Sequence, residues 1–195
     1  MLKATIDTEI FRESIDAIAA LVTECRLHTA DDHTWTRAVD TANVAMVSLD
    51  LQSTAFNTFL ATAGELGLDI AKMKNILGMM GKGDVLTLSL LDEERKLELS
   101  FGGYRYSITL LDVNTIRKDP NPPGIDLPGK AVLSGDALNS AIKAAAVISD
   151  KIALGIDPDT MTFYMEAEGD TDHIKLALGE DELVALNPVR ARSLF

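Results

Sequence analysis

Two histidines near two aspartates are the first residues whose types suggest chemistry. His28 and His33 flank Asp31 and Asp32, and imidazole and carboxylate groups are common ligands of transition metals. The four residues fall in a polar turn between two strand-like runs, and the spacing gives no closed set of ligands. We interpret the turn as a solvated hairpin and predict no metal ligand here. His173, beside Asp172, is interpreted as a surface residue at a strand end.

Four alternating carboxylates form the second candidate: Glu166, Glu168, Asp170 and Asp172. Paired carboxylates can perform acid and base catalysis or hold a metal ion. Alternation beside a turn at Gly169 is also the usual composition of an exposed loop. These residues support one alternative for the whole chain, a small acidic metal-dependent enzyme.

Two further motifs lack the partners that chemistry would need. The glycines between Gly78 and Gly83 follow a helical pattern, whereas a phosphate-binding loop precedes a helix and places Ser or Thr after its lysine. Cys25 has no patterned histidine partner and is expected to be buried and structural. We therefore predict no catalytic residue, no enzyme activity and no cofactor.

Composition limits the remaining classes of function. The chain has 195 residues, 47% hydrophobic content and a net charge of −12, so we expect a folded protein without general electrostatic affinity for nucleic acid. Its longest apolar run is too short for a bilayer, and the amino terminus lacks the pattern of a secretory signal. A single cysteine fits a reducing compartment, and we expect a cytoplasmic protein without a membrane partner.

The strongest feature of the sequence is an internal repeat. The strands and helices of the repeated units must position any functional residues of the chain. Residues 3–27 reappear without a gap as residues 130–154, at a constant offset of 127. The identical pairs are Lys3/Lys130, Ala4/Ala131, Ile15/Ile142, Ala17/Ala144, Ala19/Ala146 and Leu27/Leu154. A weaker match at an offset of 62 relates the first unit to a second that begins at Gly64. A repeat of this kind constrains the whole architecture.

Periodicity predicts that each unit consists of a strand, a helix and further strands. The first unit has a strand over 2–6, a helix over 8–21 and strands over 25–29, 34–39 and 45–51. The second has a strand over 65–69, a helix over 70–80 and strands over 85–91, 96–101 and 104–111. The third has a strand over 131–133, a helix over 136–148 and strands over 151–156, 162–167 and 174–178.

A proline-rich stretch separates the two copies of the repeat. Four of the six prolines fall between Val113 and Gly129, which predicts an extended connector. The expected divisions are an amino-terminal domain over 1–112, a connector over 113–129 and a carboxyl-terminal domain over 130–195. By the repeat, a fourth unit should begin near residues 192–195, so we expect the chain to be a fragment or a shortened gene model.

Three short strings resemble one known family. Residues 36–47 (TRAVDTANVAMV), 148–150 (ISD) and 166–172 (EAEGDTD) are similar to segments of the archaeal DNA sliding clamp, of the proliferating cell nuclear antigen family. The resemblance implies an α+β sliding-clamp fold of duplicated βαβββ units, in two similar domains of which the second is incomplete. It implies a homotrimeric ring that encircles double-stranded DNA topologically and without sequence preference, as a DNA polymerase processivity factor. A related nonreplicative clamp stays open as a further alternative.

The resemblance also implies three sets of site residues and a set of partners. Candidates for DNA contact are cations on the helix faces opposite the core: Arg12, Lys72, Lys74, Lys82 and Lys143. Candidates for subunit contact lie on two strands: Tyr106, Ile108 and Leu110, and Ile174, Leu176 and Leu178. Candidates for binding short peptide motifs of DNA polymerase, clamp loader, ligase and nuclease are Val39, Asn43, Val44, Ile125 and Leu127.

Overall fold

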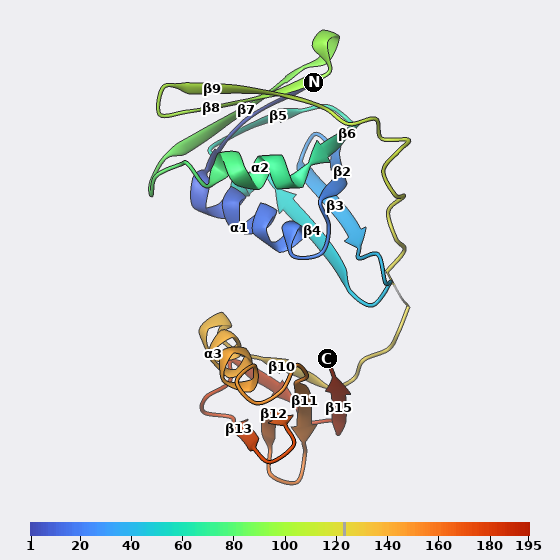
Figure 1. Ribbon diagram of the computed structural model, residues 1–195, viewed down its shortest axis with the longest axis vertical. Helices are drawn as coiled ribbons and strands as arrows, with labels where there is room; N and C mark the ends of the chain where they lie inside the picture. The colour runs from blue at the N-terminus through green and yellow to red at the C-terminus, as the bar shows by residue number, and fades with distance from the viewer. Residues whose placement is uncertain (123) are drawn as a thin grey trace. The chain divides into compact units, whose positions relative to one another are not determined.

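The computed structural model describes residues 1–122 and 124–195 and divides the chain into two compact units, Met1–Pro122 and Pro123–Phe195 (Figure 1). Both units combine short helices with antiparallel sheets, in agreement with the expected α+β class. In the described residues no helix has the length and apolar character needed to cross a membrane.

The first unit contains two sheets and two helices. One sheet has the strand order β5-β1-β7-β8-β9 and the other β4-β3-β2-β6. The helices α1 and α2 pack against each other (Figure 1). The elements are β1 (Leu2–Asp7), α1 (Thr8–Ala19), β2 (Glu24–Thr29), β3 (His33–Val39), β4 (Met46–Gln52), β5 (Thr58–Ala61), β6 (Gly64–Asp69), α2 (Ile70–Leu77), β7 (Val85–Leu91), β8 (Lys96–Phe101) and β9 (Tyr104–Thr109), with 3-10 turns at Ser53–Ala55 and Asp92–Glu94.

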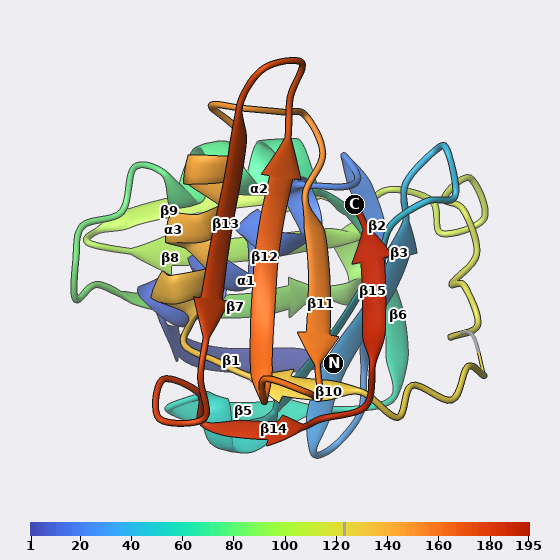
Figure 2. The ribbon, with the colours of Figure 1, turned by 90° about the horizontal axis from the view of Figure 1, so that it is seen from below.

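The second unit repeats the first half of the first unit. Its four-stranded sheet has the order β13-β12-β11-β15, whose strands lie side by side in Figure 2, and β10 pairs with β14. The elements are β10 (Lys130–Val132), α3 (Gly135–Ala145), β11 (Ala153–Asp157), β12 (Thr162–Glu168), β13 (His173–Leu178), β14 (Ala185–Asn187) and β15 (Ala191–Leu194). The pairings β11–β12, β12–β13, β11–β15 and β10–β14 match β2–β3, β3–β4, β2–β6 and β1–β5.

Two strands were not predicted from the sequence, and both obey the repeat. The offset of 127 carries the first residue of β5, Thr58, to Ala185, the first residue of β14. Each strand is too short to show an alternating pattern by itself, but pairing with a neighbour supplies its backbone hydrogen bonds. The same offset carries the start of β6, Gly64, to Ala191, where β15 begins.

The helices are shorter than their apolar patterns suggested. Asp69 caps the start of α2 by accepting a hydrogen bond from the Lys72 amide at 2.8 Å, and the helix ends at Leu77 instead of residue 80. Glycines at 78, 81 and 83 follow, and glycine is a poor helix former. The Gly81 amide bonds to the Asp84 side chain, so the glycine-rich stretch ends the helix, as its position indicated.

Separate apolar cores hold the two units. The larger core lies in the first unit, where Ile6, Ile70, Leu77, Leu86 and Leu99 are completely buried. The smaller core includes Ala141, Ile156, Phe163, Met165 and Leu178. At about 25 cal/mol per Å² of apolar surface, burial of such side chains is the main stabilising contribution.

Candidate functional site

Arg12, on α1, is bound to the end of α2. Its Nη2 donates hydrogen bonds to the carbonyl oxygens of Leu77 at 2.9 Å and Met80 at 2.7 Å. The Leu77 carbonyl also accepts from the Met80 amide at 3.2 Å, and the guanidinium gives it a second donor while binding the Met80 carbonyl just beyond the helix. Arg12 thus has a structural role, and its predicted contact with DNA stays a prediction.

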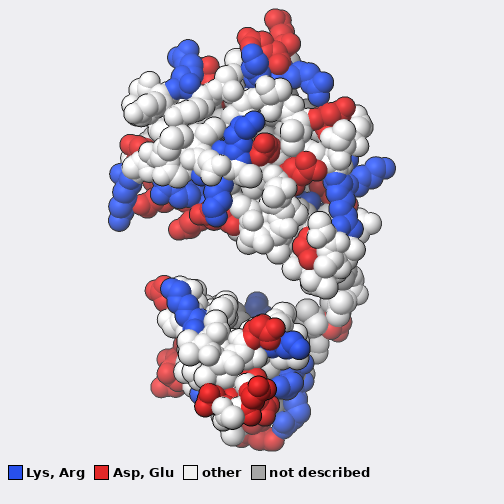
Figure 3. Space-filling view, in the orientation of Figure 1, with Lys and Arg blue, Asp and Glu red and all other residues white. Residues whose placement is uncertain are grey.

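The predicted DNA-contacting lysines lie on or just beyond the helices. Lys74 on α2 forms an ion pair with Asp16 on α1 at 2.8 Å, and Lys72 lies 3.7 Å from Asp69. Lys82 follows α2 and Lys143 is in the last turn of α3; both are exposed. On the face that Figure 3 displays, Lys and Arg are interspersed with Asp and Glu over each unit. A surface of mixed charge would make only weak contact with phosphates. DNA contact by these four lysines remains a prediction.

A rigid loop at residues 40–45 carries two of the predicted peptide-binding residues. The Asp40 carboxylate accepts hydrogen bonds from the amides of Ala42, Val44 and Ala45 at 3.3, 2.9 and 3.0 Å. These donors, first of all the Ala45 amide, lower the pKa of Asp40 below its ordinary value. Val44 is left 83% exposed at the tip of the loop. Asn43 has a φ of 60°, a left-handed conformation that asparagine tolerates.

The first part of the connector is attached to this loop and to the sheet. Arg117 donates hydrogen bonds to the Asp40 carbonyl oxygen and to the Asn43 side chain. Arg26 on β2 donates to the carbonyl oxygen of Ile116 through Nε at 3.3 Å and Nη2 at 2.7 Å. Neither arginine could be predicted as a connector contact, because their partners are about 75 to 90 residues away along the chain.

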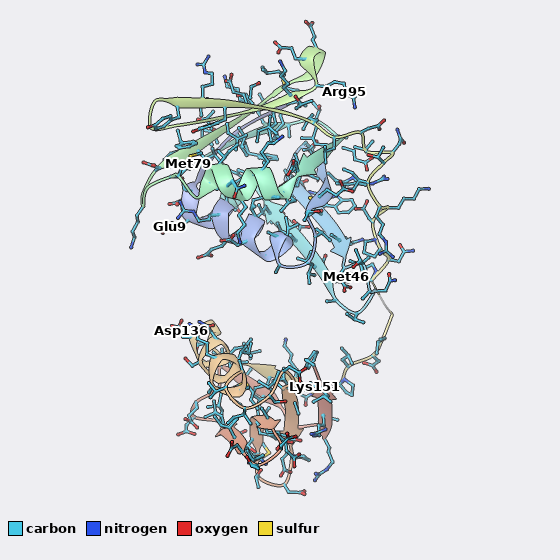
Figure 4. The ribbon with its side chains drawn as sticks, in the orientation of Figure 1. Glu9, Met46, Met79, Arg95, Asp136 and Lys151 are labelled. Carbon is cyan, nitrogen blue, oxygen red and sulfur yellow. The ribbon has the colours of Figure 1, made fainter. Side chains whose placement is uncertain are left out.

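The five predicted peptide-binding residues fall in both units. Val39 is half-buried at the end of β3. Asn43 and Val44 come shortly before Met46, which begins β4 and is labelled in Figure 4. Ile125 and Leu127 are 66% and 76% exposed and belong to the second unit. Exposed apolar side chains are available for docking, but assembly of all five residues into one pocket remains a prediction.

Five of the six predicted subunit contacts lie on two edge strands, and Leu110 directly follows the end of β9. In the described part of the chain, β9 pairs only with β8 and β13 pairs only with β12. Ile108 and Leu178 are buried in their own cores and support the strands from within. The more accessible members of the two sets are Tyr106, Leu110, Ile174 and Leu176.

Tyr104 was missed by the sequence analysis at this edge. It is 62% exposed, and its ring lies 6.3 Å from that of Tyr106 and 5.7 Å from that of Phe101. Tyr104 shares the face of Tyr106 and Ile108 because side chains alternate along a strand. That alternation is visible in the sequence and would have identified the residue.

The residues that first suggested chemistry are distributed over different contacts. His33 Nδ1 lies 2.5 Å from Asp32 Oδ1, whereas His28 Nε2 lies 2.7 Å from Asp119 Oδ2. The hydrogen bond to Asp32 raises the pKa of His33, and the same bond lowers the pKa of Asp32. The two histidines thus contact separate carboxylates.

Glu166, from the carboxylates of the enzyme alternative, and Cys25, which was expected to be structural, both have contacts that hold the fold. Glu166 Oε1 accepts from Arg192 Nη2 at 3.2 Å, and its other oxygen lies 3.9 Å from Lys175 Nζ. Burial raises the pKa of the Cys25 thiol to about 11, so little nucleophilic thiolate is present near neutral pH. Neither group favours the enzyme interpretation.

Comparisons with known proteins agree on one family. The family model described as proliferating cell nuclear antigen, N-terminal domain, matches residues 1–116. Proteins named DNA polymerase sliding clamp from Methanoculleus marisnigri and Methanosphaerula palustris are 90% and 67% identical over 195 residues, all of this chain and 79% of each relative.

Solved structures show the same similarity. The Archaeoglobus fulgidus proliferating cell nuclear antigen, bound to the C-terminal region of FEN-1, is 34% identical with a TM-score of 0.94, over all of this chain and 79% of that one. The Thermococcus kodakaraensis proliferating cell nuclear antigen, 22% identical with a TM-score of 0.90, shows the same fold over all of this chain and 81% of its own.

Proposed function

Because the chain belongs to the proliferating cell nuclear antigen family of DNA polymerase sliding clamps, we propose that three copies close head to tail into a ring around duplex DNA in the cytoplasm. In this role it acts as a processivity factor that keeps replication and repair enzymes on the template. The structural observation that supports the proposal is that β9 in one unit and β13 in the other are both edge strands, each paired on one side only among the described residues.

Two such edges are suited to a head-to-tail contact. An exposed edge strand offers unpaired N–H and C=O groups that another strand can pair with. Joining β9 of one copy to β13 of the next satisfies both edges, and repetition of the same contact closes a ring when the rotation is right. Tyr104, Tyr106 and Leu176 would then cover apolar surface at the junction.

Enclosure explains how a chain of net charge −12 can remain on DNA. Overall charge repels the phosphates, so affinity from general electrostatics is small. A closed ring needs only weak, sequence-independent contacts from Lys72, Lys74 and Lys143 on the helices and Lys82 just beyond α2. Arg12 would join them by exchanging its carbonyl partners for phosphate. Weak contacts also allow the ring to slide.

Partner enzymes are proposed to dock at the loop 40–45 and the connector. Asp40 and Arg117 fix the loop, so the exposed Val44 is presented on a rigid support. Apolar residues of a short peptide would contact Val39, Val44, Ile125 and Leu127, with Asn43 at the rim. The Archaeoglobus relative bound to a FEN-1 segment supports nuclease binding, and polymerase, clamp loader and ligase are proposed to use the same surface.

Whether the protein slides off free DNA ends tests the proposal that it forms a closed ring around DNA. The protein is loaded onto nicked circular plasmid by a clamp loader and washed at high salt, which screens weak phosphate contacts. We expect it to remain on the circle and to leave after the plasmid is cut once. Equal retention on circular and linear DNA would contradict enclosure.

A variant at the proposed junction provides the matched test of assembly. Leu176→Asp places a charge on the half-exposed face of β13, and we expect it to abolish both trimer formation and retention on circles. Lys175→Ala, at the neighbouring position on the opposite face, is the control and should preserve both. Trimers of Leu176→Asp measured by light scattering would show that β13 is not the interface.

A further inference from the structure

Three paired strands place an aromatic and two metal-ligating residues in one row. In the sheet β4-β3-β2-β6, His28 on β2 is directly opposite Trp35 on β3 and Glu65 on β6. Residues in directly opposed positions project from the same face of a sheet, with their Cβ atoms about 5 Å apart. The Trp35 and His28 rings stack at 3.8 Å with an interplanar angle of 9°, which restricts the orientation of the imidazole.

The connector adds a third ligand to this row. Asp119 Oδ2 lies 2.7 Å from His28 Nε2. The other oxygen, Oδ1, is buried and has no hydrogen-bond partner among the residues that the structure describes. A buried carboxylate oxygen without a partner costs free energy, and a cation would satisfy it.

The three side chains are close enough to share one ion. One donor atom from each of His28, Glu65 and Asp119 lies within 4.8 Å of the other two. Ligand atoms around tetrahedral Zn²⁺ are about 3.4 Å apart, as follows from bonds of roughly 2.1 Å. Completing the site would therefore bring the widest pair of donor atoms closer by at most about 1.4 Å and separate His28 Nε2 from Asp119 Oδ2 by about 0.7 Å. Arg26 Nη1 bonds to Glu65 Oε1 at 2.9 Å, which leaves Oε2 for the metal.

We propose that His28, Glu65 and Asp119 bind a divalent transition-metal ion of the Zn²⁺ type, with water in the fourth position. One imidazole and two carboxylates form a donor set that suits Zn²⁺ better than the all-oxygen sites of Mg²⁺ or Ca²⁺. The ion binds His28 Nε2 in place of the hydrogen bond to Asp119, and the neutral imidazole then carries its proton on Nδ1. Binding ties the connector to β2 and β6, independently of the ring and its partners.

The stacked Trp35 gives a direct readout because it is the only tryptophan of the chain. Titration with Co²⁺, a paramagnetic substitute for Zn²⁺, should quench Trp35 fluorescence and saturate at one ion per chain. Calorimetric titration with Zn²⁺ should show the same stoichiometry. Asp119→Asn and Glu65→Gln keep the side-chain shapes and should each weaken Zn²⁺ binding at least about tenfold, since even groups behind the ligands contribute that much.

Two control variants exclude binding elsewhere. His33→Ala removes a second imidazole that contacts a carboxylate, that of Asp32, and Asp126→Asn removes an exposed carboxylate of the connector; both should bind Zn²⁺ as the unaltered chain does. The proposal is wrong if the unaltered protein binds no stoichiometric Zn²⁺, if Asp119→Asn binds it equally well, or if His33→Ala abolishes binding. Unchanged urea midpoints of the two amide variants without metal would show that their loss of binding is not loss of fold.

Discussion

Truncation of Arg12 tests how the helix pair of the first unit is held together. Its Nη2 donates to the Leu77 and Met80 carbonyl oxygens at 2.9 and 2.7 Å. A hydrogen bond that involves a charged group contributes about 1.5–3 kcal/mol. The Leu77 carbonyl keeps a hydrogen bond from the Met80 amide after truncation, and removal of the long side chain opens this site to water. We therefore expect Arg12→Ala to lower the free energy of unfolding by about 2 kcal/mol in total.

Urea unfolding of the first unit provides the assay, since Trp35 on β3 reports on that unit alone. With a urea dependence of about 2 kcal/mol per molar, the expected loss moves the midpoint down by about 1 M. Arg12→Lys keeps the charge but not the planar guanidinium and should lose about half as much. Lys82→Ala, an exposed cation of the same unit, is the control and should change stability by less than about 0.5 kcal/mol.

Two results would refute the reasoning about Arg12. If Arg12→Lys were as stable as the unaltered chain, a positive charge would suffice and the two specific hydrogen bonds would not matter. If Arg12→Ala lost no more stability than Lys82→Ala, the side chain would be dispensable to the helix pair and its capping role would be disproved.

Three further predictions concern the first unit. Gly67→Ala would place a Cβ 2.4 Å from the Leu111 carbonyl oxygen, and we expect a loss of about 1–3 kcal/mol in urea unfolding; unchanged stability would contradict that close approach. Cys25, with a pKa of about 11, should react with iodoacetamide at pH 8 only after unfolding, and rapid labelling of the folded protein would disprove its burial. The pKa of His33 is raised and that of Asp32 is lowered by their mutual hydrogen bond. The pair of charged side chains therefore stabilises the fold most between about pH 4 and 6.5. This stabilisation falls as His33 deprotonates at higher pH and as Asp32 is protonated at lower pH; an NMR titration of His33 that is unchanged by Asp32→Asn would contradict the pairing.

The sequence predicted most of the fold because the repeat and the apolar periodicity are both local signals. Val85–Leu91 and Lys96–Phe101 were predicted to the residue. The helix ends were wrong by two to three residues, since apolar residues such as Met80 continue to pack beyond the helix end at Leu77. The strands Thr58–Ala61 and Ala185–Asn187 were missed because their pairing partners, not their own composition, make them strands.

The contacts of the candidate site were less predictable, for a physical reason. Arg12 was predicted to contact DNA and Arg117 was given no role, because only folding brings their carbonyl partners, 65 to 77 residues away, into reach. His28 appeared to belong with His33 in a hairpin, yet strand register and the connector place it with Glu65 and Asp119. Long-range hydrogen bonds leave no periodic trace in a sequence.

The measurement closest to the proposed function is the length of DNA that a polymerase synthesises per binding event on a long primed circular template. With the protein and a clamp loader present, we predict products many times longer than those of the polymerase alone, and loss of the gain when Leu176→Asp replaces the unaltered chain. Products of the same length with and without the protein, at every salt concentration tested, would contradict its role as a processivity clamp.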